Sequence, residues 1–564
     1  MGSIYILQAA QCQQSELWFN INWKNCNSKV RSLQYRIVKS VRKGEWRKVK
    51  RLYYLLTQSF SARALAVKRV TENKGKKTAG IDGVVWQTPR QKMQATATIA
   101  NWHGYQPNAL RRIRIPKKDK NQTRPLSIPT MEDRARQALH LFALQAIAET
   151  LGDTNSYGFR SKRRCADAID QIFKVLRQKG SSQWTLEADI KGFFDNIDFD
   201  WILQNIPMNK NVLKAWLTSG FIEGGKLYPT TEGVPQGGII SPVVGNMVLD
   251  GLEAIICGIP YYKRRHGINF VRYADDFIVT AKTKEVLENE IIPKINAFLK
   301  LRGVQLSEQK TKITHISEGF DFLGQSVRKY HRLDGALGKI QIEPSKESIQ
   351  SIKGKVKAIC KSSGQLTQAQ MIERLNPVLR GWANYHRHII CGRTYADINS
   401  YVWFRLMRWG KGRHPKKSGI WIAKRYFSHA KNSTWAFKDK VTGKTLIRLN
   451  YDIHTFRHIK IQGEANPFDS EWSEYFLNRE KSIKVKSVSH YIGKISTQQG
   501  GKCPHCQQLL QAEDKHSLHH LDGDKTNRGI KNMLLLHKTC NKAFEYIQGK
   551  NVFGASIDMG VSHA

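Results

Sequence analysis

Two runs of apolar residues near the start of the chain follow the spacing of three and four that places side chains on one face of an α-helix. They are Val30, Leu33, Ile37 and Val41, and then Val49, Leu52 and Leu56. The surrounding residues 24–77 contain seventeen Lys and Arg but only two acids. This pattern predicts two amphipathic helices with basic outer faces. Such faces can be merely solvated, but the near absence of acids favours contact with RNA.

Short β-type runs alternate with helical stretches from about residue 105 to 330, as in an α/β or α+β catalytic domain. After residue 345 the pattern is mainly helical. Eight Lys and Arg and no acid lie between Arg405 and Arg425, together with Trp409 and Trp421. Because cations contact phosphates and aromatic rings stack on bases, this segment suits nucleic acid. A plain basic surface over buried tryptophans explains it nearly as well.

The length and charge of the chain narrow the choice of partners. The 564 residues predict about three to five domains, and 40% hydrophobic residues are enough for several cores. A formal net charge of +45 favours a polyanionic partner. Membranes also attract basic proteins, but we find no run of eighteen apolar residues, no lipidation motif and no signal-peptide pattern. Nucleic acid is therefore the expected partner, and a membrane is not.

The nine cysteines are scattered over the first 400 residues and cluster only near the end. This distribution argues against a disulfide framework and for a reducing, cytoplasmic compartment. Cys503 and Cys506 form one ligand pair, and His537 and Cys540 form a second. Two pairs that each chelate from a tight turn predict a tetrahedral structural Zn²⁺ site, with a redox CxxC as the alternative. We expect a small module with its own core that depends on this metal.

Two adjacent carboxylates, Asp275 and Asp276, lie between the apolar runs Phe270-Val271 and Phe277-Ile278-Val279. Apolar runs around a short polar tip predict a β-hairpin that presents both carboxylates at its turn. An earlier strand-like run ends at Asp189. Carboxylates that converge on one point repel each other unless divalent cations lie between them. Two Mg²⁺ ions held in this way can activate a 3′-hydroxyl and stabilise the leaving pyrophosphate.

A series of motifs in the chain resembles the reverse transcriptase encoded in bacterial group II introns. The motifs are TAGIDG (78–83), RIRIPKKDKNQTRPLSIPT (112–130), SYGFRSKRR (156–164), ADIKGFFDNID, PQGGIISP, YADD, LSEQKTKI (306–313), FDFLG (320–324) and the thumb segment LNPVLRGWANYHR (375–387). The resemblance implies an α+β multidomain fold: a right-hand polymerase with an antiparallel sheet in fingers and palm, a helical thumb and a small ββα-metal nuclease domain. The expected domains are a basic extension (1–77), fingers and palm (78–330), thumb (331–430), a DNA-binding region and linker (431–485) and the nuclease domain (486–564).

The resemblance also implies roles for individual residues. Asp189, Asp275 and Asp276 correspond to the ligands of two Mg²⁺ ions. Lys117 and Arg124 correspond to contacts with the triphosphate of the incoming dNTP, and Gln236 and Gly237 to a loop near the nascent base pair. Phe194 corresponds to the steric gate that excludes a 2′-hydroxyl, with Phe193 as the fallback. Lys310 is the candidate proton donor to pyrophosphate, although Lys312 could serve.

Between the two ligand pairs, HSLHHLDGD and a segment containing Asn532 resemble an HNH endonuclease domain. The resemblance implies that His520 activates water as a general base, that His519 binds one catalytic divalent metal and that Asn532 braces the loop. Members of that family often carry histidine ligands after the last cysteine. Here Asn541 and Glu545 occupy those positions, and both offer oxygen ligands. This departure leaves open a zinc-folded DNA-binding module without cleavage.

Together these features predict a protein that polymerises DNA on RNA, binds its own group II intron RNA to assist splicing, and nicks target double-stranded DNA. It would act in the cytoplasm and on the nucleoid. One alternative is a splicing cofactor with an inactive polymerase, but the complete carboxylate set argues against it. Another is a freestanding homing endonuclease, against which the intact nucleotide-contacting residues count.

Overall fold

A computed structural model describes most of the chain. The described residues are 17–116, 123–333, 335–362, 364–430, 433–487, 490–508, 510, 516–524, 527, 529–538, 540–541 and 543–545. Lys117, one of the expected triphosphate contacts, lies outside them. Helices and strands both contribute throughout, so the α+β class expected from the sequence is confirmed.

The basic N-terminal segment folds into helices that surround one long buried helix. They are α2 (Trp23–Arg42), α3 (Trp46–Gln58), α4 (Phe60–Glu72), α5 (Pro89–Thr98) and the central α6 (Met131–Leu151). The sequence predicted two amphipathic helices here, and α2 and α3 bury the expected apolar residues, with Leu33 packed at the edge of the core. Helix α4 was missed because small residues on it are buried on more than one side, so its amphipathic signal is weak.

The residues expected to form the palm, called the palm below, contain a four-stranded antiparallel sheet in the order β6-β7-β3-β8. Its strands are β3 (Trp184–Ala188), β6 (Asn269–Tyr273), β7 (Asp276–Ala281) and β8 (Lys312–His315). Apolar side chains of β3, β6 and β7 join those of the covering helices in one core. These helices are α8 (Phe193–Asn196), α9 (Phe199–Asn205), α10 (Lys210–Leu217), α11 (Ser241–Leu249), α12 (Leu252–Cys257), α13 (Pro260–His266), α14 (Lys284–Val286), the π-helical η1 (Leu287–Ile291) and α15 (Ile292–Lys300).

A second sheet lies within residues 78–330, which were expected to form fingers and palm, and it is called the fingers sheet below. Its order is β2-β1-β4-β5, with β1 (Leu110–Pro116), β2 (Thr123–Ile128), β4 (Phe221–Glu223) and β5 (Lys226–Tyr228). Strand β1 is antiparallel to β2 and parallel to β4. On the other side of the palm, α7 (Cys165–Leu176) packs against β6 and joins a separate core with the strands that lead to the thumb.

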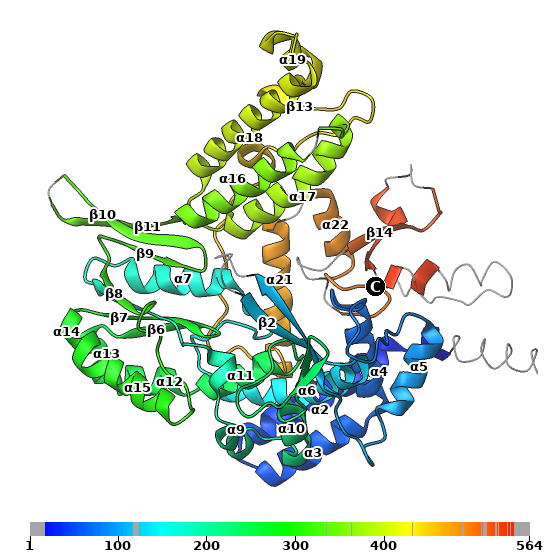
Figure 1. The fold of residues 1–564 in the computed structure, drawn as a ribbon, viewed down its shortest axis with the longest axis vertical. Helices are drawn as coiled ribbons and strands as arrows, with labels where there is room; N and C mark the ends of the chain where they lie inside the picture. Colours follow the sequence, from blue (N-terminus) through cyan, green and yellow to red (C-terminus); the bar gives the residue numbers. More distant parts are fainter. Residues whose placement is uncertain are drawn as a thin grey trace, which may run out of the picture.

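The helical region predicted after residue 345 is confirmed (Figure 1). A three-stranded sheet of β9 (Phe320–Phe322), β10 (Gln325–His331) and β11 (Leu337–Pro344) leads to α16 (Lys346–Lys361), α17 (Gln368–His386), α18 (Gly392–Arg413), α19 (Gly419–Tyr426), β12 (Phe427–Ala430), β13 (Ser433–Phe437) and α20 (Leu449–Asp452). Trp409 is buried in the core of this region, in agreement with the alternative of a basic surface over buried tryptophans, whereas Trp421 is half-buried.

The segment expected to be a linker is bound to the palm along much of its length. His458 and Arg479 both contact the buried Asp167 of α7, at 2.9 and 2.6 Å. Farther along, Asp469 forms an ion pair with Arg42 of α2 at 2.5 Å. The segment of residues 458–487, called the strap below, contains η2 (Ser470–Trp472) and α21 (Ser473–Ser487). It carries the chain from the thumb back to the N-terminal helices.

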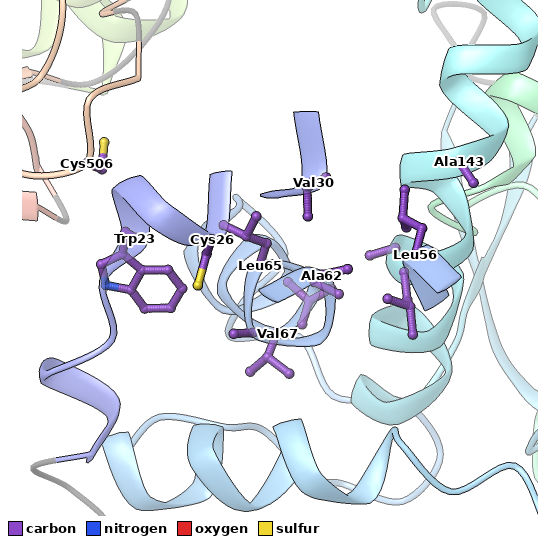
Figure 2. Packing of buried hydrophobic residues seen from close by; sticks show 14 of the residues in the cluster. Trp23, Cys26, Val30, Leu56, Ala62, Leu65, Val67, Ala143 and Cys506 are labelled. Atoms are coloured by element: carbon purple, nitrogen blue, oxygen red, sulfur yellow. The ribbon is translucent and has the colours of Figure 1, made fainter. Parts of the chain in front are cut away.

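The C-terminal module lies against the N-terminal helices (Figure 1), and it comprises α22 (His490–Gln498), β14 (His516–His520), η3 (Ile530–Asn532) and β15 (Met533–His537). The expectation of a separate core is wrong. Ile495, Cys503, Cys506 and Leu536 belong to the same buried cluster as α2–α6. Figure 2 shows Cys506 on the side of this cluster where Trp23 lies. The few apolar residues of the C-terminal module are therefore buried both by folding of the module and by its packing against the N-terminal helices.

Within the described residues, no single helix is long and apolar enough to cross a membrane, and one bent pair, Ser241–Cys257 with Pro260–His266, meets the length and composition requirements.

Candidate active site and metal centre

The predicted carboxylate hairpin is present between β6 and β7. Tyr273 pairs with Asp276, which leaves Ala274 and Asp275 as a two-residue turn. Ala274 adopts a φ of 60°, a left-handed conformation that such turns require. The segment SYGFRSKRR (156–164) packs directly against this turn, because a Cβ on Gly158 would lie 2.4 Å from the Ala274 nitrogen. Glycine at 158 therefore allows the two backbones to meet.

A fully buried arginine anchors this hairpin. The Arg272 guanidinium forms an ion pair with Asp250 at 2.5 Å and lies 3.8 Å from Asp153. Burial raises the pKa of the Asp250 carboxyl to about 6, and Arg272 and then Arg160 partly oppose that shift. Arg272 was not among the residues predicted from the sequence. The available signal was a cation within an otherwise apolar strand, which needs a buried partner.

Asp189 lies next to the hairpin because of the sheet register. Ala188 is the last residue of β3 and pairs with Phe277. Because β3 and β7 are antiparallel, the residue after Ala188 lies beside the residue before Phe277, which places Asp189 beside Asp276. Burial raises the pKa of Asp275, and the charge of Asp189 adds to the effect. Burial, then Asp275 and Asp189, raise the pKa of Asp276 to about 6. The structure thus gathers the three predicted carboxylates into one repulsive group.

This carboxylate group fits divalent cations. Its donors are hard oxygens, and its mutual repulsion is the kind that cations between the carboxylates relieve. Lys310 bonds through Nζ to Asp189 Oδ2 and supplies one compensating charge. Lys312 instead forms an ion pair with Glu187 at 3.4 Å. Of the two candidate lysines, the structure brings Lys310 to the site.

Phe194 and Phe193 lie in different environments although they are adjacent. Phe193 is buried in the palm core, whereas Phe194 is half-buried, with its ring beside Gly245 of α11. A Cβ on Gly245 would lie 2.9 Å from the Phe194 ring. The same Cβ would lie 3.1 Å from the Phe193 ring, so the glycine leaves space for both rings. Of the two phenyl groups, only Phe194 has surface left to meet a ligand.

The predicted loop at Gln236 and Gly237 joins fingers and palm. Gln236 donates from its side chain to Asp195 at 3.2 Å, and its carbonyl accepts from the Ser127 nitrogen at 2.7 Å. Gly237 has a φ of 120°, and a Cβ there would lie 2.4 Å from the Ser127 oxygen. Only glycine fits this approach. Arg124 is exposed on the same strand, β2, and its charge lowers the pKa of Asp275 and Asp276.

The two Cys/His pairs come together as predicted. Ligand atoms of Cys503, Cys506, His537 and Cys540 all lie within 4.8 Å of one another. The His537 Nδ1 atom is 3.4 Å from the Cys506 sulfur and 3.9 Å from the Cys540 sulfur. Ligands of a tetrahedral zinc ion are about 3.5 Å apart, given Zn–S and Zn–N bonds of ~2.3 and ~2.0 Å. The donor set and its spacing therefore fit zinc.

Cations from the N-terminal helices flank this metal centre. Lys68 of α4 forms an ion pair with Glu72 at 2.8 Å. Burial opposes the charge on Lys68, but Glu72 and the sulfur of Cys540 outweigh it and raise its pKa. Burial lowers the pKa of Arg31 of α2, and the Cys506 sulfur partly offsets this. Three thiolates and one zinc ion would carry a net negative charge, which these two cations complement.

The segment that resembles an HNH domain forms a hairpin, in which His519 pairs with Leu534 and His520 with Met533. Asn532 braces the following loop, because its side chain donates to Asp522 Oδ1 at 2.8 Å and accepts from the Asp522 nitrogen at 3.1 Å. The His519 ring contacts Phe544 with centroids 5.0 Å apart. This contact brings His519 to the helical turn that carries Asn541 and Glu545.

Asn541 has one oxygen that suits a metal. Its Nδ2 donates to Glu545 Oε1 at 2.7 Å, while its Oδ1 is buried and accepts no hydrogen bond from the described residues. A buried acceptor without a partner is costly, and a divalent cation would satisfy it. The position that departs from the usual histidine therefore still fits a hard metal ion.

Comparison with protein families agrees with this architecture. The family described as N-terminal domain of reverse transcriptase matches residues 18–99, and reverse transcriptase (RNA-dependent DNA polymerase) matches residues 115–327. The group II intron, maturase-specific domain matches residues 349–427. The chain belongs to the group II intron-encoded reverse transcriptase/maturase family. The three matches cover the N-terminal helices, the palm and fingers and the thumb, and they end before the C-terminal module.

Individual relatives of this reverse transcriptase/maturase chain are distant. Group II intron-encoded protein LtrA of Lactococcus lactis subsp. cremoris is 28% identical over 330 residues, covering 47% of this chain and 54% of LtrA. Protein YkfC of Escherichia coli (strain K12) is 29% identical over 344 residues, covering 53% of this chain and 89% of YkfC. Maturase-like protein 1 of Euglena gracilis is 23% identical over 393 residues, covering 69% of this chain and 80% of the Euglena protein. The chain spans about half the length of LtrA.

The shared core leads to a prediction about Cys503→Ser. Loss of a ligand should weaken zinc binding, which contributes about 10–16 kcal/mol of apparent free energy to small zinc modules. Because the module shares its core with α2 and α4, the amides of these helices should also exchange hydrogen faster. Zinc content and residue-resolved hydrogen exchange measure both effects. Cys391→Ser, at a buried cysteine of the thumb, is the control, and unchanged exchange in α2 and α4 would contradict the shared core.

Proposed function

We propose that the protein is an RNA-directed DNA polymerase. The observation that carries this proposal is the group of Asp189, Asp275 and Asp276, crowded at one end of the palm sheet and balanced by Lys310 and Arg124. Membership in the reverse transcriptase/maturase family supports the same reaction. An inactive polymerase that serves only splicing would have no need for this arrangement. The intact carboxylates and the ordered Gln236–Gly237 loop support catalysis.

Each residue of the site would have its own role in the reaction. Mg²⁺ bound by the three carboxylates would supply the charge that activates a 3′-hydroxyl and stabilises pyrophosphate. Arg124, together with Lys117, would hold the triphosphate of the dNTP. Lys310 has its ammonium group at Asp189, and the hydrogen bond to that carboxylate raises its pKa. This ammonium group would give a proton to the leaving pyrophosphate.

RNA binding would involve the surfaces on either side of the palm. The maturase-specific match at residues 349–427 supports group II intron RNA as the partner and assistance in its splicing as the role. The basic outer faces of α2 and α3 supply cations for phosphates. The protein would then act in the cytoplasm and, when its intron RNA is inserted into target DNA, on the nucleoid.

A second candidate function is cleavage of target double-stranded DNA by the C-terminal module. The orphaned Oδ1 of Asn541, near the hairpin that carries His519, supports a site for one divalent cation. His520, the last residue of β14 and directly before the braced loop, would take a proton from water. A freestanding homing endonuclease would not need the polymerase centre, so we place cleavage second to polymerisation.

Asp275→Asn should abolish RNA-templated DNA synthesis, because an amide of equal size is a poor ligand for the metal pair. Binding of the RNA template should persist, since loss of a negative charge does not weaken contact with a polyanion. Primer extension and RNA affinity, measured side by side, test this. Asp200→Asn is the matched control, because Asp200 is exposed on α9 and the charge changes equally. Normal extension by Asp275→Asn would refute the catalytic assignment.

Phe194→Ala should admit ribonucleotides, because it removes the ring that has exposed surface beside Gly245. The ratio of dNTP to rNTP incorporation efficiency measures the effect, and the ratio should fall. The conservative Phe194→Tyr, which keeps the ring, should retain discrimination. Since Phe193 is in the core, an unchanged ratio in Phe194→Ala would place the gate outside this pair.

His520→Ala should remove DNA cleavage while zinc content and primer extension remain normal, because His520 is not one of the four zinc ligands. Cleavage is measured on double-stranded target DNA with Mg²⁺ or Mn²⁺, using the protein bound to its intron RNA. If the wild-type protein does not cut, Asn541→His should recover some cleavage by restoring the commoner ligand. Failure of both would favour a zinc-folded DNA-binding module.

A further inference from the structure

A cavity of about 1380 Å³ lies between the N-terminal helices and the palm, outside the polymerase centre. Its walls come from α3, from residues 100–106, from α6 and from residues 204–215 around the start of α10. Figure 1 shows α3, α9 and α10 together at the bottom of the molecule. Pockets for one small molecule have volumes of ~300–1,000 Å³, so this cavity has room for a larger ligand.

Aromatic side chains form one side of the cavity. They are Trp46, Tyr53, Tyr54, Trp102 and Tyr105. Trp46 and Tyr54 are 41% and 64% exposed, although rings of this size are usually more deeply buried. Such exposed rings offer flat apolar faces on which another flat ring can stack.

The base of the aromatic wall is held by hydrogen bonds. The Tyr53 hydroxyl and His140 Nδ1 are 3.0 Å apart, and the His140 ring meets Trp102 edge-on at 5.0 Å. Burial lowers the pKa of His140 to about 3, so the ring is neutral. Tyr105 donates to Asp133 at 2.6 Å. These contacts preorganise the wall, and the Arg136 guanidinium supports it, 4.7 Å from the Trp102 ring centroid and 4.1 Å from that of Tyr105.

Amides and lysines supply the polar part of the lining. Gln58, Gln106, Gln204 and Asn211 line the cavity, and their side chains make no hydrogen bond to another described residue. Lys50 and Lys210 also line it, and none of the described lining residues is acidic. Lys50 continues the exposed basic face of α3 that includes Arg47 and Arg51. Aromatic faces, amides and cations at one place match the base, the base edge and the phosphate of a nucleotide.

We infer that this cavity binds unpaired nucleotides of RNA, with their bases stacked against Trp46 and Tyr54 and their phosphates on Lys50 and Lys210. The inference rests on the proposed RNA binding but not on polymerase activity. The basic face of α3 would lead an RNA strand to the cavity, and the free amides would read base edges. Double-stranded RNA keeps its bases stacked internally, so it should not use the cavity.

The test compares three RNA probes with the full-length protein at one salt concentration. The probes are a single-stranded oligonucleotide, an abasic strand with the same phosphates, and a blunt duplex. Tyr54→Ala should weaken binding of the single strand by roughly 5- to 150-fold, the fold-change that corresponds to one lost stacked base. Binding of the abasic strand and the duplex should not change. Tyr54→Phe, which keeps the ring, should bind like the wild type.

Tyr261→Ala is the matched control, because Tyr261 is 62% exposed but lies on α13 and does not line the cavity. Ala215→Trp, which fills the cavity from α10, should reproduce the loss seen in Tyr54→Ala. Equal loss for abasic and base-containing strands in Tyr54→Ala, or no loss in both variants, would overturn the inference. So would capture of an aromatic peptide at the cavity without discrimination between bases and abasic sites, which would indicate a protein partner.

Polymerase and cavity can fail separately. Tyr54→Ala should extend a short primer on a duplex-proximal template as well as the wild type does. If the wild type does not extend primers but discriminates bases through Tyr54, the polymerase proposal fails and this one stands. If extension is normal and the abasic strand binds the wild type as tightly as the base-containing strand does, the cavity inference fails alone.

Discussion

A guanidinium without solvent contact determines where the polymerase centre lies. Arg272 is fully buried and must be paired, since an uncompensated charge in the protein interior is very costly. Its partners, Asp250 and Asp153, follow α11 and α6, so this ion pair joins strand β6 to both helices. The turn that carries the proposed metal ligands begins two residues later. The position of Asp275 and Asp276 relative to the helices is therefore set by an interaction beneath them.

The crowding of the three carboxylates costs free energy. Burial and mutual repulsion raise the pKa of Asp275 and Asp276, so the folded chain opposes their ionisation. Such opposition is typical of functional sites, where charge is concentrated in advance of a ligand that relieves it. Close backbone approaches at Gly158 and Gly237 hold the surrounding motifs near enough to keep this arrangement. The glycines in these motifs are thus explained by geometry at the site.

The two ends of the described chain meet in one core. The zinc-type ligand set is built on the C-terminal module, yet its sulfurs interact electrostatically with Lys68 and Arg31 of the N-terminal helices. The strap through Asp469 and Arg479 returns the chain to that position. The N-terminal helices and the C-terminal module therefore share their stability. A substitution that destabilises one of them should therefore also destabilise the other, without any contact between their ligands.

Features that depend on neighbours in sequence were determined by the sequence alone. The Asp275–Asp276 hairpin follows from apolar runs around a polar tip, and the Cys503–Cys506 pair follows from one tight turn. Only the tertiary structure decided which of Phe193 and Phe194 faces outward, that Lys310 meets Asp189 and that the C-terminal module docks on α2 and α4. The physical reason is that burial and ion pairing depend on segments far apart in the chain, whose packing is selected by shape and charge together rather than by any local pattern.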